Sequence, residues 1–335
     1  MKKLKKDMLA GFLDRLSKEY AVIAPVKSGK GHTEFKCTKD FRQLSLEDNG
    51  INPVKEFFFP QNEELFVYKD GEVAESTEGE KVIIFGVRPC DIRSVEVLDR
   101  VFLDERFIDA YYKKRRDNAI IIGYACPKDE PGCFCRSFGI DPEDSGSSDL
   151  SMFEDEENYY FQLNHEKASY IIEDPALSDA GTGLPAGSHR QGWEAAVGIG
   201  FPLDPKQLFH APVWEKLYQK CIGCGTCTYL CPTCHCFELC NRKSAAGVQR
   251  IRCWDSCQYA LFTEHASGHN PRNTQKERIR QRIMHKFSYY PQNYGVVACV
   301  GCGRCLRKCP VAFDLREALE TIGEYGKESG MKTDG

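Results

Sequence analysis

The chain has 335 residues, of which 41% are hydrophobic and 28% charged, and its formal net charge is −4. This slightly acidic balance gives no overall basic surface, which disfavours nucleic acid as a partner. The length suits two domains with separate cores, and no apolar run reaches the ~20 residues that a transmembrane helix needs.

Residues 1–20 predict an amphipathic helix, because their apolar positions recur at helical intervals. Asp7, Asp14 and Arg15 interrupt those positions, whereas a secretory signal peptide needs an unbroken apolar stretch. We therefore expect a cytoplasmic protein. Its eighteen cysteines then favour metal binding or redox chemistry over disulfides, because the cytosol keeps thiols reduced.

A mixed α/β domain is predicted for residues 1–204. The runs at 64–69, 81–87 and 118–125 are rich in β-branched and aromatic residues and are bounded by turn residues, which is typical of strands. Apolar residues at helical spacing separate the last two runs. A strand–helix–strand unit with parallel strands is therefore expected.

Four cysteines near the ends of these two strands predict an iron–sulfur site. Cys90 follows the first strand, Cys126 follows the second, and Cys133 and Cys135 lie in the next Pro/Gly-rich loop. If the strands are neighbours, their carboxyl ends meet at the edge where open α/β sheets place their sites. Four thiolates there suit a [4Fe-4S] cluster, with zinc or inert thiols as the alternatives. Cys37 has no partner in the sequence and is expected to be an ordinary thiol.

Residues 205–335 form the second predicted domain, because cysteine density rises there while strand signals fade and helical patterns dominate. The expected fold class is α+β, with a mainly helical, ferredoxin-like C-terminal domain. One predicted helix, at 273–290, carries an apolar stripe. Its basic residues are expected to form a solvated face, with docking of an acidic partner or the approach to a cluster as the alternatives.

Two stretches of this domain repeat one cysteine spacing. The first motif, "CIGCGTCTYLCP", begins at residue 221, and the second, "CVGCGRCLRKCP", begins at residue 299. Both follow C-x2-C-x2-C-x3-C-P, in which three cysteines bind one [4Fe-4S] cube and the fourth binds the other. Glycines between the cysteines let the chain wrap tightly, with backbone N–H groups directed at the sulfurs. The rule assigns the first cluster to Cys221, Cys224, Cys227 and Cys309, and the second to Cys299, Cys302, Cys305 and Cys231.

Structural zinc is the alternative interpretation of paired C-x2-C motifs. A zinc site needs neither the third cysteine nor the Cys-Pro, and the full motif occurs twice, which favours two iron–sulfur clusters. The segment between the motifs is longer than in a minimal two-cluster ferredoxin. This insert holds either a further metal or redox site or buried thiols. Its cysteines are Cys234, Cys236, Cys240, Cys253 and Cys257.

The chain lacks the usual sequence motifs of nucleotide binding and hydrolysis. No G-x-G-x-x-G follows a predicted strand, and there is no full phosphate-loop pattern, nucleophile elbow or metalloprotease motif. One-electron cofactors without a recognisable substrate site favour a role in electron transfer.

Five stretches carry a resemblance to a known family: "VRPCDIRSVEVLDRVFL", "CFCRSFGIDP", "CIGCGTCTYLCPTCHCFE", "CWDSCQ" and "CVGCGRCLRKCPV". The chain resembles the family of iron–sulfur subunits found in anaerobic sulfite reductases and, as beta subunits, in multisubunit cytoplasmic hydrogenases. The resemblance implies a 4Fe-4S dicluster subunit that works with a flavin subunit binding NAD(H) or NADP(H). The eight motif cysteines, Cys90 and the Cys126, Cys133 and Cys135 group match the family, whereas Cys240 and Cys253 depart from it.

The expected function is electron transfer in a hetero-oligomeric complex, between the flavin subunit and a catalytic subunit of the sulfite reductase, hydrogenase or heterodisulfide reductase kind. On this hypothesis the chain alone is not a catalyst. The alternatives are a self-contained iron–sulfur reductase acting on a small substrate, through a thiol pair such as Cys234 and Cys236, and a zinc-organised interaction scaffold. The sequence leaves open the substrate, the nicotinamide and the direction of electron flow.

Overall fold

The computed structural model describes residues 1–29, 31–75, 79–128, 130–181, 205–245 and 247–330. None of the helices in these ranges is long and apolar enough to span a bilayer. The chain divides into two compact units, each assembled from segments that are distant in sequence. Unit 1 comprises Met1–Phe58, Thr77–Glu130 and Gly139–Ala195, and unit 2 comprises Phe59–Ser76, Pro131–Phe138 and Ala196–Gly335. The predicted domain boundary at 204/205 adjoins residues 182–204, which lie outside the described residues.

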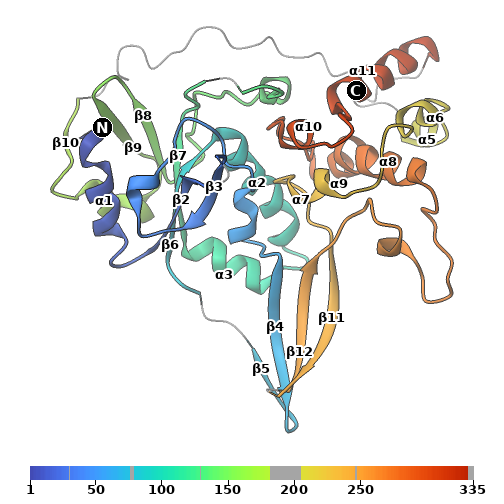
Figure 1. Cartoon of the computed structure of the whole chain (residues 1–335), viewed down its shortest axis with the longest axis horizontal. Helices are drawn as coiled ribbons and strands as arrows, with labels where there is room; N and C mark the ends of the chain where they lie inside the picture. The colour runs from blue at the N-terminus through green and yellow to red at the C-terminus, as the bar shows by residue number, and fades with distance from the viewer. Residues whose placement is uncertain (30, 76–78, 129, 182–204, 246, 331–335) are drawn as a thin grey trace. The chain divides into compact units, whose positions relative to one another are not determined.

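Unit 1 is built on an eight-stranded mixed sheet of order β10-β1-β9-β8-β7-β6-β2-β3 (Figure 1). The central strands β2, β6, β7 and β8 are parallel, and the outer pairs are antiparallel. The strands are β1 (Lys2–Lys5), β2 (Ala21–Lys27), β3 (Thr33–Cys37), β6 (Val82–Val87), β7 (Ala119–Tyr124), β8 (Leu150–Glu154), β9 (Asn158–Leu163) and β10 (Ser178–Asp179).

The helices of unit 1 confirm the predicted strand–helix–strand unit. β6 leads into α2, which begins at Pro89 with its fixed helical φ, and β7 follows as the parallel neighbour of β6. The helix predicted for residues 1–20 is shorter than expected, because Lys2–Lys5 pair with β9 as a strand. The helices are α1 (Leu9–Leu16), α2 (Pro89–Phe102), α3 (Ala110–Asn118) and α4 (Ser169–Ile172), with 3-10 turns at Lys6–Met8, Phe41–Gln43, Val54–Phe57 and Glu166–Ala168.

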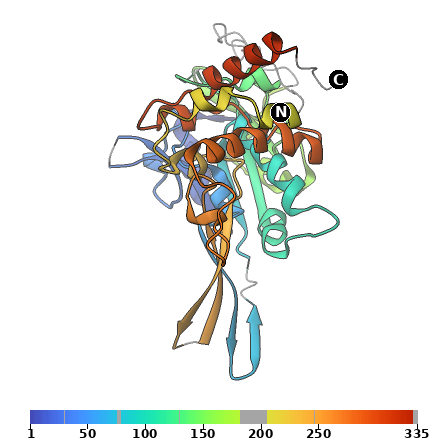
Figure 2. The same ribbon diagram turned by 90° about the vertical axis from the view of Figure 1, so that its right-hand side faces the viewer.

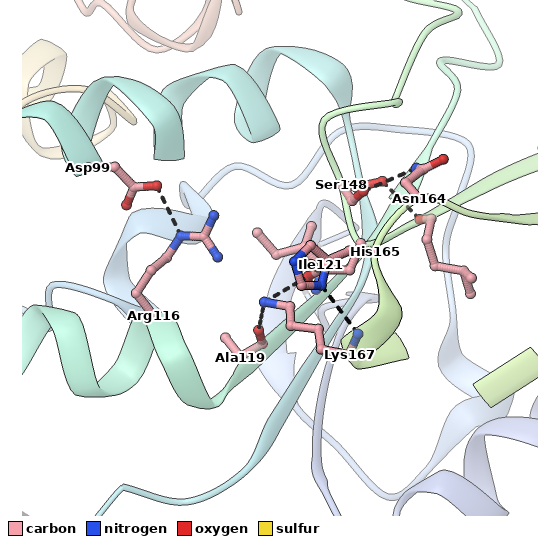
Figure 3. Close-up of polar contacts among 10 residues, drawn as sticks. Asp99, Arg116, Ala119, Ile121, Ser148, Asn164, His165 and Lys167 are labelled. Carbon is pink, nitrogen blue, oxygen red and sulfur yellow. Dashed lines mark hydrogen bonds and ion pairs between the residues drawn. The ribbon is translucent and has the colours of Figure 1, made fainter. Parts of the chain in front are cut away.

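Polar contacts anchor α3 and the start of β7 (Figure 3). Arg116 of α3 donates from Nε to Asp99 of α2 at 3.1 Å. Lys167 Nζ donates to the carbonyl oxygen of Ala119 at 2.8 Å, at the first residue of β7. The backbone N–H of Ile121 donates to the Asp149 carboxylate at 2.8 Å. These contacts hold in place the strand that leads to Cys126.

Unit 2 contains a four-stranded antiparallel sheet of order β11-β12-β4-β5, drawn in blue for β4 and β5 and in orange for β11 and β12 (Figure 2). The strands are β4 (Asn62–Lys69), β5 (Glu72–Glu75), β11 (Phe237–Ser244) and β12 (Gly247–Trp254). The β11–β12 hairpin lies in the insert between the two motifs, where no strand was predicted. The strand predicted at 64–69 is present as β4, but it pairs with β12 in unit 2.

The helical part of unit 2 packs around an apolar core. Ile279 and Ile283 of the predicted stripe are buried there with Trp214 and Leu319. Phe134 is buried in the same core, which accounts for the assignment of Pro131–Phe138 to unit 2. The elements are a 3-10 turn at Cys135–Phe138, α5 (Pro205–Phe209), α6 (Val213–Leu217), α7 (Thr226–Tyr229), a 3-10 turn at Leu261–Thr263, α8 (Gln275–Met284), a π-helical turn at His285–Tyr289, α9 (Tyr290–Tyr294), α10 (Arg304–Arg307) and α11 (Leu315–Glu328).

Candidate iron–sulfur site

The two cysteine motifs fold into similar loops. Gly223 and Gly225 of the first motif and Gly301 and Gly303 of the second all have positive φ, between 59° and 76°. Gly225 directly precedes α7, Gly303 directly precedes α10, and these two helices contact each other. The positive φ angles explain why glycine occupies these positions, because other residues rarely adopt them.

Backbone and side-chain N–H groups point at cysteine sulfurs in these loops. The N–H of Gly223 donates to Cys221 Sγ at 3.4 Å, and the N–H of Phe313 donates to Cys309 Sγ at 3.3 Å. Gln275 of α8 also donates to Cys221 Sγ, at 3.3 Å. N–H groups directed at sulfur stabilise an anionic thiolate or cluster and tune its potential.

One pocket of unit 2 brings together cysteines from both motifs. Its lining includes Cys221, Cys224 and Cys227 of the first motif and Cys305 and Cys309 of the second. Cys231, the fourth cysteine of the first motif, is not among the lining residues. The pocket therefore contains the four cysteines that the two-cluster ferredoxin rule assigns to one cube, together with Cys305, which the rule assigns to the other cube.

Cys231 lies instead with cysteines of the second motif. Burial raises the pKa of Cys299 to about 12, Lys286 opposes the rise, and the charges of Cys231 and Cys305 add to it. Lys286 Nζ donates to Cys231 Sγ at 3.2 Å and to the carbonyl oxygen of Ala298, the residue before Cys299, at 2.8 Å. Cys302 is buried in the same loop. This position of Cys231 agrees with the predicted exchange of fourth cysteines between the motifs, and the ligand sets stay a prediction.

Three of the insert cysteines, Cys234, Cys236 and Cys257, contact other cysteines. A hydrogen bond from Cys236 lowers the pKa of Cys257 to about 6, although burial acts in the opposite direction. A hydrogen bond with Cys231 raises the pKa of Cys234. Among the described residues, no three Cys, His, Asp or Glu side chains converge as the ligands of a single metal ion do.

The other two insert cysteines lie on the hairpin. Cys240 of β11 and Cys253 of β12 have their Sγ atoms 3.9 Å apart. These two thiols therefore form a close pair within the hairpin.

The four cysteines predicted for a third cluster divide between the units. In unit 1, Cys90 is buried at the start of α2 and Cys126 follows the end of β7. Cys133 and Cys135 belong to unit 2, where Phe134 between them donates its N–H to the carbonyl of Gly301 at 2.8 Å. The sequence placed this pair in the first domain and gave no sign of its contact with the second motif. The third cluster stays a prediction.

The remaining predicted thiol, Cys37, is exposed at the end of β3.

Comparisons with known proteins were made for the whole chain. Residues 220–313 match the family model of the 4Fe-4S dicluster domain. The chain is 32% identical over 339 residues to sulfhydrogenase 2 subunit beta of Pyrococcus furiosus, and the alignment covers 96% of this chain and 98% of that relative. No solved structure matches the chain. The dicluster segment contains both motifs and the whole insert.

Proposed function

Because this chain belongs to the iron–sulfur family of the sulfhydrogenase beta subunit and carries a 4Fe-4S dicluster domain, we propose that it relays single electrons within a multisubunit hydrogenase-like complex. The family predicted from the motifs is confirmed, and the dicluster domain implies two [4Fe-4S] clusters. The proposed partners are a flavin subunit that binds NAD(H) or NADP(H) and a catalytic subunit. The observation that carries the proposal is the gathering of thiols from both motifs in one pocket.

The proposed ligands follow the grouping of the cysteines. The first cluster site is Cys221, Cys224, Cys227 and Cys309, and the second cluster site is Cys299, Cys302, Cys305 and Cys231. The pocket lining contains all four cysteines of the first set, with Cys305 of the second set beside them. The contacts of Lys286 with both Cys231 and Ala298, the residue before Cys299, support the placement of Cys231 in the second set. A [4Fe-4S] cluster accepts and releases one electron at a time.

The two proposed sites differ in their access to solvent. Cys224 is exposed, and the neighbouring Ile222 is 65% exposed. Cys231 and Cys302 of the second site are buried, so the protein excludes water from their sulfurs. We therefore propose that electrons pass between this chain and a partner subunit at the first site. The second site then holds a buried cluster that exchanges electrons with the first.

Further clusters are proposed at two other sets of cysteines. A third cluster would use Cys90, Cys126, Cys133 and Cys135, as the sequence predicts. A further cluster in the insert would draw on its five cysteines, of which Cys240 and Cys253 form a close pair on the hairpin. Iron analysis gives the number of clusters, because two clusters hold about eight iron atoms per chain and three hold about twelve.

The relay function is tested by reducing the purified chain anaerobically, alone and with its flavin subunit. Dithionite is expected to bleach the visible absorption of the chain alone, whereas NADH or NADPH is expected to do so only with the flavin subunit present. Turnover of sulfite or protons by the chain alone with an artificial electron donor would instead support the self-contained reductase. Failure of the flavin subunit to reduce the chain would contradict the relay.

The loop glycines give a prediction about cluster binding. A Cβ at Gly301 would lie 2.5 Å from the backbone N of Cys135 and from the backbone C of Phe134, at a φ of +59°. We expect Gly301→Ala to reduce the iron bound per chain by up to one cluster, about four atoms. Gly295→Ala is the matched control, because Gly295 also has positive φ but has nothing within 4 Å of the added Cβ. Equal iron content in the two variants would show that the close approach at Gly301 is unimportant.

A further inference from the structure

Two cations are buried one helical turn apart in unit 2. Arg282 lies near the end of α8 and is 3% exposed, and Lys286 lies in the π-helical turn that follows and is 4% exposed. The expectation that the basic residues of this helix form a solvated face is wrong for these two. Lys276, earlier on the same helix, is instead partly exposed and pairs with Glu215 at 2.7 Å.

Neither buried cation has a carboxylate partner. In the part of the chain that the structure describes, no Asp or Glu forms an ion pair with either side chain, and Arg282 Nε has no hydrogen-bond partner. An unpaired buried charge is strongly unfavourable, so a compensating negative charge is required close by. Thiolates that bind an anionic cluster supply this negative charge. The two buried cations are therefore consistent with clusters at the proposed sites.

Arg282 faces thiols of both proposed sites. It lines the pocket that contains Cys227 of the first proposed site. Cys305, which belongs to the second proposed site, lines the same pocket. One guanidinium is therefore close to a proposed ligand of each cluster.

Lys286 is directed at the second site. Its Nζ donates to Cys231 Sγ at 3.2 Å, to Thr233 Oγ1 at 2.9 Å and to the carbonyl oxygen of Ala298 at 2.8 Å. An ammonium group has three donors, and these three acceptors use them all. The charge is therefore fixed in position against the cysteine that crosses from the first motif to the second cluster.

We propose that Arg282 and Lys286 raise the reduction potentials of the two clusters, Arg282 acting on both and Lys286 chiefly on the second. Reduction adds one negative charge, and a fixed positive charge in a low-dielectric interior stabilises the reduced form more than the oxidised form. The N–H···S hydrogen bond from Lys286 acts in the same direction. This inference rests on the proposed ligand sets, and it assigns to both residues a tuning role that involves no proton transfer.

The test is a redox titration of the anaerobically purified full chain, followed by electron paramagnetic resonance. In Lys286→Met we expect the equilibrium constant for reduction of the second cluster to fall at least tenfold. This corresponds to a reduction potential lower by about 59 mV for a one-electron couple, and we expect a smaller change at the first cluster. In Arg282→Met both clusters are expected to shift. Lys276→Met is the control, because it removes a partly exposed positive charge of α8 that is already paired with Glu215, and it is expected to leave both potentials unchanged. The signals are assigned to the two clusters with Cys231→Ser and Cys309→Ser.

Three further variants, Lys286→Gln, Lys286→Arg and Arg282→Gln, separate the effect of charge from failure to assemble. Lys286→Gln removes the charge but keeps a hydrogen-bond donor, and it replaces the Met variant if that one fails to assemble. Lys286→Arg keeps the charge and is expected to stay near the wild-type potential. Full iron content with unchanged potentials in Lys286→Gln and Arg282→Gln would overturn the tuning role and leave the relay intact. Absence of iron from the wild-type chain would overturn the relay itself.

Discussion

Replacing Cys231 with serine is expected to remove the second cluster and to leave the first, although Cys231 belongs to the first motif. The reason is the proposed exchange of fourth cysteines, in which Cys231 binds the second cluster with the cysteines of the second motif. The expected loss is about four iron atoms per chain. Iron analysis together with electron paramagnetic resonance of the reduced protein measures the loss and shows which cluster signal remains.

The reciprocal variant, Cys309→Ser, is expected to remove the first cluster and to leave the second. Cys309 lines the pocket with Cys221, Cys224 and Cys227 although it lies in the second motif. Cys37→Ser is the control, because Cys37 is exposed on β3 in unit 1. This variant is expected to retain the full iron content. If each substitution removed the cluster of its own motif, the exchange of ligands would be wrong.

Glu63→Ala is expected to destabilise unit 2 by about 3–5 kcal/mol, because it leaves a buried arginine without its carboxylate. Arg252 of β12 lies directly opposite Glu63 of β4, and the two side chains are 4% and 1% exposed. Arg252 Nε donates to Glu63 at 2.8 Å, and its guanidinium lies 5.2 Å from the centre of the Phe59 ring. Urea unfolding under anaerobic conditions, followed by circular dichroism, measures the change.

An exposed ion pair in the same unit supplies the control. Glu215 pairs with Lys276 at 2.7 Å, and the Glu215 side chain is 61% exposed. Glu215→Ala is therefore expected to cost less than about 1 kcal/mol. The double variant Glu63→Met with Arg252→Met is expected to recover most of the stability, because no buried charge is left unpaired. A Glu63→Ala protein as stable as the Glu215→Ala protein would contradict a structural role for the buried pair.

Features that depend on neighbouring residues were predicted well. The spacing of the motif cysteines led to the two-cluster family, and the apolar run at 81–87 and the helical spacing after it led to β6, α2 and their parallel neighbour β7. The apolar stripe that begins at Ile279 is buried as expected. In each case the spacing of cysteines or of apolar residues lies within one loop, strand or helix, and such local patterns predict local structure.

Features that depend on distant partners were missed. The β11 segment "FELCNRKS" is largely polar and exposed, so no strand pattern marks it, and its hairpin is joined to the sheet through β4, far away in the sequence. Arg282 and Lys286 looked like residues of a solvated face, because sequence alone does not show which thiols face them. The contact of Phe134 with Gly301 was hidden for the same reason.

The central claim is that thiolates from two separated motifs interleave around paired iron–sulfur cubes. The most direct test is the electron paramagnetic resonance spectrum of anaerobically purified wild-type protein after reduction with dithionite. The account predicts signals from two reduced [4Fe-4S] clusters in a chain that holds at least about eight iron atoms. A colourless protein that contains zinc, little iron and no such signal would contradict it.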